Sequence, residues 1–148
     1  VPAAPRAPCL GGAGFRWCGH RGSTPRSVNR LGGVRVQGGG EGAAEALVAG
    51  AVALEEAGVM GMVLEMVPEQ VAARVTEALA VPTIGIGAGA HCDGQVLVWS
   101  DMAGMTEWRP RFAKQFGRVG DALRQAALEY AAAVREGSFP APEHWFSS

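Results

Sequence analysis

The chain of 148 residues has little of several features that would each indicate a particular class of protein. Its 13 basic side chains against 14 acidic ones give a net charge of −1, so no broad basic surface is available for nucleic acid. No apolar run approaches the roughly 20 residues that a membrane helix needs. The three cysteines have no regular spacing and the sequence shows no secretory signal, so we expect a cytoplasmic protein.

Aromatic residues make up only 7% of the chain, so its core must consist largely of Ala, Val and Leu, whereas glycine is abundant with 22 residues. The length suits one domain. Residues 1–18 contain Pro2, Pro5 and Pro8 and have no apolar period, which predicts an irregular, poorly ordered lead-in. We therefore expect one α/β domain over residues 19–148.

Apolar residues at helical spacing predict helices, and short apolar runs predict buried strands. The predicted helices are 41–56, one opening at Pro68, 109–116 and 121–136, the predicted strands are 59–65, 82–87 and 95–99, and residues 19–42 are predicted as a loop. The strands are continuously apolar, which indicates a parallel sheet covered by helices. The fold is therefore a doubly wound sheet or part of a (β/α) barrel.

The last predicted helix has an apolar side at helical spacing. Leu123, Ala127, Tyr130 and Val134 share this side, and Gly137 follows as a stop signal. We interpret these side chains as core packing.

Glu65 is the most informative residue, because it ends an apolar strand just before the helix signal at Pro68. In parallel α/β folds, the carboxyl ends of strands line the ligand crevice. A carboxylate that its neighbours shield from water there is suited to general acid–base catalysis. The alternative is a strand-end Glu that caps the next helix or pairs with an Arg.

His20 lies in the segment GHRG (19–22), whose two ends are glycines, and it would either bind an anionic substrate group or form structural hydrogen bonds to backbone carbonyls. Cys18 with His20, or the run 91–93 (His-Cys-Asp), lacks a second pair of ligands at zinc-site spacing, so we assign no metal ligand. The GIGAG run of residues 85–89 is not followed by a helix and does not fit a dinucleotide fingerprint. It predicts backbone that closely approaches a ligand or a neighbouring loop.

Several blocks in one order make the sequence resemble the ketopantoate hydroxymethyltransferases. The blocks are GH-x-G-x-TP-x-SVN-x-LGG-x-x-VQG (19–38), ALEEAG-x-x-x-x-VLE-x-VP (53–68), IGIGAG-x-x-x-DGQVLV (84–98) and EH-x-F (143–146). The resemblance covers about residues 19–146. It implies the C-terminal half, about strands five to eight, of a (β/α)₈ barrel of the phosphoenolpyruvate/pyruvate type, because a whole barrel takes roughly 250 residues.

The resemblance also implies an activity. This family transfers a hydroxymethyl group from 5,10-methylenetetrahydrofolate to 3-methyl-2-oxobutanoate, a small 2-oxo acid, giving 2-dehydropantoate in pantothenate biosynthesis. It uses Mg²⁺ and usually forms a homodecamer. Glu65 falls on the family's proton acceptor, and His20 falls on its substrate-pocket histidine. The family's metal ligands and substrate lysine fall in the half that precedes this chain, so we expect the chain to be inactive alone.

Two other functions remain open at this stage. In the first, the chain is a non-catalytic half barrel that acts only in assembly with a partner half or a full-length relative. In the second, it belongs to a lyase that has a related barrel fold and acts on a 2-oxo acid. Dependence on tetrahydrofolate separates the lyase from the transferase.

Overall fold

The computed structural model describes residues 16–23, 36 and 38–146. The chain divides into two units, the first ending at Val96 and the second beginning at Leu97. Of the predicted lead-in, residues 1–15 lie outside the described residues. In the described part of the chain, every helix is too short or too polar to traverse a bilayer.

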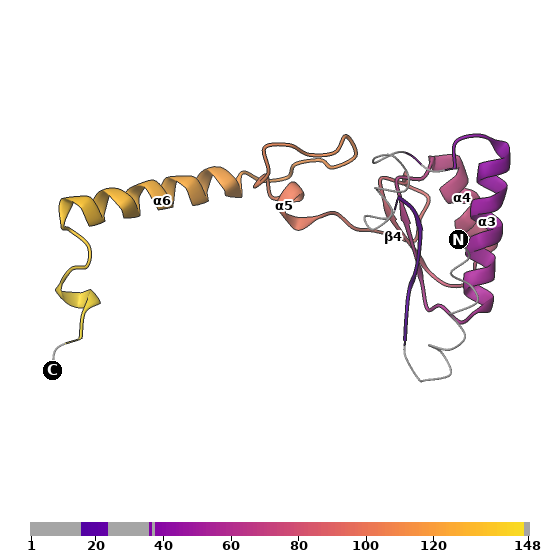
Figure 1. Cartoon of the computed structure of the whole chain (residues 1–148), viewed down its shortest axis with the longest axis horizontal. Helices are drawn as coiled ribbons and strands as arrows, with labels where there is room; N and C mark the ends of the chain where they lie inside the picture. Colours follow the sequence, from indigo (N-terminus) through magenta and orange to yellow (C-terminus); the bar gives the residue numbers. More distant parts are fainter. Residues whose placement is uncertain (1–15, 24–35, 37, 147–148) are drawn as a thin grey trace. The chain divides into compact units, whose positions relative to one another are not determined.

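The first unit contains a parallel sheet of four strands (Figure 1). The strands are β1 (Gly19–Gly22), β2 (Met62–Glu65), β3 (Thr83–Ile86) and β4 (Gly94–Gln95), and they lie side by side in sequence order. Every neighbouring pair is parallel. The predicted α/β class with a parallel sheet is therefore confirmed, and β2 and β3 lie within their predicted strands.

Two strand predictions are wrong. Gly19–Gly22 forms β1 although it was predicted as a loop, because its backbone pairs with β2 and local apolar patterning does not reveal that pairing. The predicted strand 95–99 ends after Gln95, and Trp99–Met102 is instead a short helix, α5. Beyond Gln95, the backbone N of Val96 still donates to Gly85 O, but Val96 is 46% exposed. An apolar run without a neighbour to cover it therefore does not continue the sheet.

Two helices pack on one face of the sheet (Figure 1). Helix α3 (Glu41–Glu56) has the predicted bounds, and Gly58 follows it with φ 90°. Helix α4 (Glu69–Ala78) begins directly after Pro68, as predicted. Both helices direct small and branched side chains to a common core with β2; the buried helical residues are Ala44, Leu47, Ala51, Leu54, Val71, Ala72 and Val75.

The side chains of β2 alternate between this core and the opposite face of the sheet. Met62 and Leu64 of β2 are fully buried against the helices, whereas Val63 and Glu65, which alternate with them, are partly exposed. Strands with a period of 2 direct successive side chains to opposite faces. We call the side of the sheet opposite α3 and α4, with Val63 and Glu65 on it, the open face.

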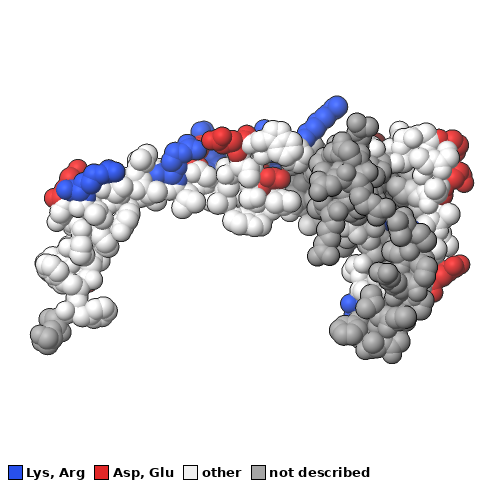
Figure 2. All heavy atoms as spheres, in the orientation of Figure 1, with Lys and Arg blue, Asp and Glu red and all other residues white. Residues whose placement is uncertain are grey.

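The second unit contains helix α6 (Val119–Glu136) and the 3₁₀ turn Pro142–His144. The helix agrees with the prediction, and Gly137 ends it in a left-handed conformation with φ 72°. Charged side chains gather along one side of α6 (Figure 2), where Asp121 pairs with Arg118 and Arg124.

The predicted core role of α6 is wrong for the described residues, because no residue of the helix is buried and Leu123 and Tyr130 are 58% and 60% exposed. Helical periodicity shows that an apolar side exists, but it does not show what covers that side.

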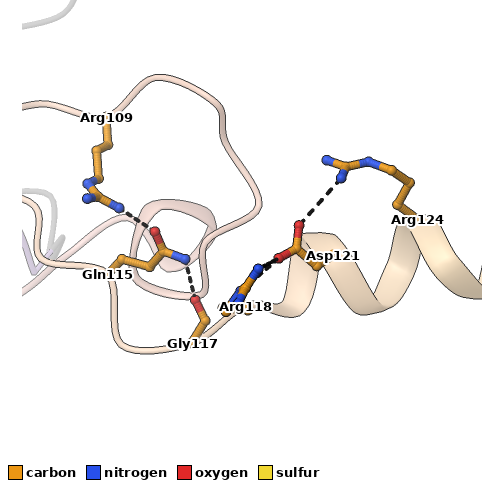
Figure 3. A network of polar contacts seen from close by, with 6 residues as sticks. All are labelled: Arg109, Gln115, Gly117, Arg118, Asp121 and Arg124. Carbon is orange, nitrogen blue, oxygen red and sulfur yellow. Dashed lines mark hydrogen bonds and ion pairs between the residues drawn. The ribbon is translucent and has the colours of Figure 1, made fainter.

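The predicted helix 109–116 is also absent; these residues form a turn and extended loop. Side-chain hydrogen bonds, and not the backbone hydrogen bonds of a helix, stabilise this loop (Figure 3). Arg109 donates to the Gln115 amide oxygen, and Gln115 Nε2 donates to Gly117 O at 2.7 Å. Polar side chains therefore determine the local structure here more than the apolar spacing does.

Asp93 fixes the connection between β3 and β4. Its Oδ2 accepts from the backbone N of Thr83 at 2.8 Å and from Thr83 Oγ1 at 3.0 Å. The Asp93 backbone N donates to Thr83 Oγ1 at 3.2 Å, so each of the two residues donates a hydrogen bond to the other. The Thr83 amide, and after it the Thr83 hydroxyl, hold the pKa of Asp93 below its ordinary value of 3.8.

This lowered pKa makes the stability of the fold depend on pH. A carboxyl group whose pKa is lower in the folded state stabilises the fold above its unfolded value, and that stability is lost as the pH falls through the folded value. Asp93→Asn is therefore expected to lower the melting temperature at pH 7, with the difference from wild type shrinking as the pH falls below 3.8. Thermal melts from pH 7 to pH 2 measure this. The control is Glu77→Gln, an exposed carboxylate on α4, and a pH-independent Asp93→Asn effect would contradict the prediction.

Candidate active site

Glu65 is the last residue of β2, as the sequence predicts, and lies at the carboxyl edge of the sheet. Its position in the register is level with Gly22 of β1 and Ile86 of β3. Its side chain is 20% exposed. A carboxylate at the end of a central parallel strand therefore lies beside an apolar neighbour and remains open to a small molecule.

His20 lies on the same open face, two register positions earlier. It is level with Val63, so its side chain alternates with that of Arg21 and shares the face of Glu65. The Nε2 atom of His20 lies 3.1 Å from Oε2 of Glu65, and the His20 side chain is 37% exposed. The structure thus brings together the two site residues that the sequence analysis selected.

The contact with His20 involves one of the two carboxylate oxygens of Glu65. The imidazole holds Oε2 and leaves Oε1 of Glu65 without a partner among the described residues. One oxygen is therefore oriented by the protein, while the other is available to accept a proton from a bound molecule.

Gly22 allows β1 to approach the backbone of Glu65. Its φ is 94°, and an added Cβ would overlap the carbonyl oxygen of Glu65. That carbonyl accepts from the Ser23 backbone N at 2.8 Å. Only glycine combines this φ with such a close approach without strain. The GHRG sequence of β1 thus supplies both the histidine and the space that lets its strand lie against Glu65.

The GIGAG run begins in β3 and continues past its carboxyl end, next to the carboxyl end of β2. Gly87 and Gly89 have φ values of 64° and 79°, and a Cβ on Gly89 would collide with the Glu69 side chain. Glu69 Oε1 also lies 3.4 Å from Nε2 of His91, and both side chains are more than half exposed. The close backbone approach predicted for this run is therefore made to the start of α4.

The pairing of His20 with Glu65 was not predicted. The pairing depends on residues 19–22 forming strand β1, and these residues were predicted as a loop. If residues 19–22 had been placed beside β2, the alternation of the two strands would have put both side chains on one face.

The described residues do not provide a metal centre. Among them, no three His, Cys, Asp or Glu side chains are close enough together to hold an ion. Of the run 91–93, Asp93 is turned to Thr83 and not toward a shared ligand position. The described residues therefore do not fit the Mg²⁺ ion that the family resemblance implies, and ligands for it would have to come from elsewhere in the protein.

A family model described as ketopantoate hydroxymethyltransferase matches residues 4–142. The chain belongs to this family. The match begins earlier than Gly19, where the sequence resemblance starts, and includes most of the predicted lead-in.

Curated relatives carry the corresponding name, 3-methyl-2-oxobutanoate hydroxymethyltransferase. The relative from Rhodococcus jostii (strain RHA1) is 56% identical over 144 residues, which is 97% of this chain and 50% of that protein. The relative from Mycobacterium ulcerans (strain Agy99) is 55% identical over 93% of this chain and 46% of that protein. The relative from Mycobacterium tuberculosis (strain ATCC 25618 / H37Rv) is 53% identical over 93% of this chain and 49% of its own length. The chain thus spans about half the length of the curated relatives it matches.

Proposed function

We propose that the protein formed with this chain is a hydroxymethyltransferase of pantothenate biosynthesis. In the proposed reaction, 5,10-methylenetetrahydrofolate, water and 3-methyl-2-oxobutanoate give tetrahydrofolate and 2-dehydropantoate. The observation that supports this most is the Glu65 carboxylate, which ends a central parallel strand and is held by His20 at 3.1 Å. The names of relatives that are more than half identical to the chain support the same substrate.

Glu65 is proposed to accept the proton from C3 of the 2-oxo acid. The electron pair of the broken C–H bond stays on the substrate as an enolate, and C3 then forms the new bond to the methylene carbon. The two bonds from that carbon to the folate nitrogens break, and water supplies the hydroxyl group of the product. His20 fixes one oxygen of the carboxylate, so Oε1 is the atom proposed to take the proton. The apolar side chains of Val63 and Ile86 share the open face with Glu65.

We also infer that the four-stranded sheet is part of a (β/α)₈ barrel. The strands are parallel and lie in sequence order, and α3 and α4 cover one face only. In a barrel the other face is the interior, where side chains from all strands meet. The remaining strands would come from the part of the relatives' length that this chain does not span. A cytoplasmic location and a decameric assembly stay predictions.

A complementation experiment tests the proposed function. The chain alone is expected to form no 2-dehydropantoate, because its described residues hold no metal-ligand cluster and half of the relatives' length is absent. Co-expression with the unmatched half of the Rhodococcus jostii relative is expected to produce the activity. Mass spectrometry would follow the product with Mg²⁺ and 5,10-methylenetetrahydrofolate supplied.

Each other outcome contradicts part of the proposal. Association of the two halves without product would refute the enzymatic function and favour the non-catalytic half barrel. Turnover of the 2-oxo acid without tetrahydrofolate would instead favour a lyase. Full activity of the chain alone would refute the proposed division of the active site between two halves.

A further inference from the structure

Met66, which directly follows Glu65, has a backbone conformation that is unusual for its residue type. Its φ is 51°, and no other non-glycine residue in the described part of the chain has a positive φ. Side chains with a Cβ rarely adopt this left-handed region, and such residues cluster at functional sites. The position of Met66 beside the proposed proton acceptor therefore calls for a physical reason.

The peptide between Glu65 and Met66 is held from both sides. The Glu65 carbonyl accepts from Ser23 N at 2.8 Å, next to β1, and the Met66 amide donates to Ile86 O of β3 at 2.9 Å. This peptide is thus the last link of the sheet at the carboxyl end of β2. The chain changes direction at the following backbone bonds, which are those of Met66.

The change of direction reverses the alternation of the strand. Met62 and Leu64 face the core, and Val63 and Glu65 face the open side, so a continued strand would place Val67 on the open side with Glu65. Val67 is instead 2% exposed within the core. A Cβ on Gly22 would lie 2.8 Å from its Cγ2, so Val67 packs tightly against β1.

We propose that Met66 is a positioning residue for Glu65. Its left-handed backbone ends β2 so that Val67 enters the core while the carboxylate stays on the open face, in contact with His20. The thioether has no part in this role. The effect on turnover rests on the proposed function, whereas the effect on the His20–Glu65 contact does not.

Substitutions at Met66 separate backbone from side chain. Glycine adopts positive φ freely and asparagine does so more readily than most residues, whereas β-branched valine strongly disfavours it. Met66→Gly and Met66→Asn are therefore expected to keep the contact, and Met66→Val is expected to lose it. Met102→Val in the second unit is the matched control for the same side-chain change at an ordinary φ.

The experiment uses the chain in the two-half assembly described above. The ¹⁵N signals of the His20 imidazole report its contact with Glu65, and circular dichroism reports folding. Met66→Val is expected to shift these signals to those of a Glu65→Ala variant, which has no group to contact His20, and to lower kcat by about 10²-fold with KM little changed, since small misplacements of a reacting group have effects of this size. Met66→Gly, Met66→Asn and Met102→Val are expected to match wild type.

Two outcomes would overturn the inference: wild-type His20 signals in a folded Met66→Val variant, or altered signals in Met66→Gly. If Met66→Val does not fold, Met66→Ala decides, because a loss of the contact on removing only the thioether would contradict a backbone role. If wild type lacks transferase activity, the proposed function fails, while the His20 signals still test Met66. If wild type is active and Met66→Val leaves the His20 signals unchanged, only the positioning role fails.

Discussion

Replacing Glu65 by Gln is expected to lower kcat for hydroxymethyl transfer by about 10²- to 10⁴-fold, the usual contribution of a general base. Gln has nearly the same shape, and its amide oxygen can take the place of the carboxylate oxygen beside His20, so the sheet edge is conserved. What disappears is the ability to accept the C3 proton. We expect KM for the 2-oxo acid to change little, because the substitution removes an interaction made in the transition state. Initial rates in the two-half assembly measure both constants.

Glu69→Gln is the matched control for this experiment. Glu69 also lies beside a histidine, His91, but it is on α4 and 51% exposed, and we assign it no proton transfer. Its kcat is expected to stay close to that of wild type. Equal losses in the two variants, or a Glu65→Gln variant with nearly wild-type activity, would contradict the assignment of Glu65 as the proton acceptor.

The position of Glu65 was predictable because its signal is local. An apolar run that ends in a carboxylate and is followed by proline defines a strand, its end and the next helix within ten residues of sequence. The place of His20 was not predictable in this way. Its strand has two glycines among four residues and exists because β2 pairs with it. Such pairing depends on tertiary structure, which overrides weak local preferences.

The same distinction explains the outcome for α6 and Met66. The helical period of α6 predicts its bounds well, since capping and period act within the helix, but burial depends on other elements. The left-handed φ of Met66 has no sequence signal, because glycine or asparagine is the residue type expected there. Structure therefore added most where a residue's role depends on neighbours from other strands.

Truncating Leu64 to Ala is expected to destabilise the first unit by about 2–5 kcal/mol, the cost typical of a buried Leu→Ala cavity. Leu64 is fully buried in the middle of β2, level with Arg21 of β1 and Gly85 of β3. These neighbours are poorly able to fill the space. Gly85 has no side chain, and Arg21 is tied by Nη2 to Gly50 O of α3 at 2.6 Å. The cavity should therefore remain open and its cost should lie in the upper part of that range.

Urea unfolding followed by tryptophan fluorescence measures this loss, because Trp17 packs against the core that contains Leu64. A total stability of about 5–15 kcal/mol for a domain makes the shift in midpoint large. Leu128→Ala on α6 is the control: Leu128 is 60% exposed, so its truncation should change stability by no more than about 0.5 kcal/mol. A cost below about 1 kcal/mol for Leu64→Ala would contradict a core centred on β2. Since Glu65 follows Leu64 directly, such a result would also remove the rigid strand on which the proposed proton acceptor depends.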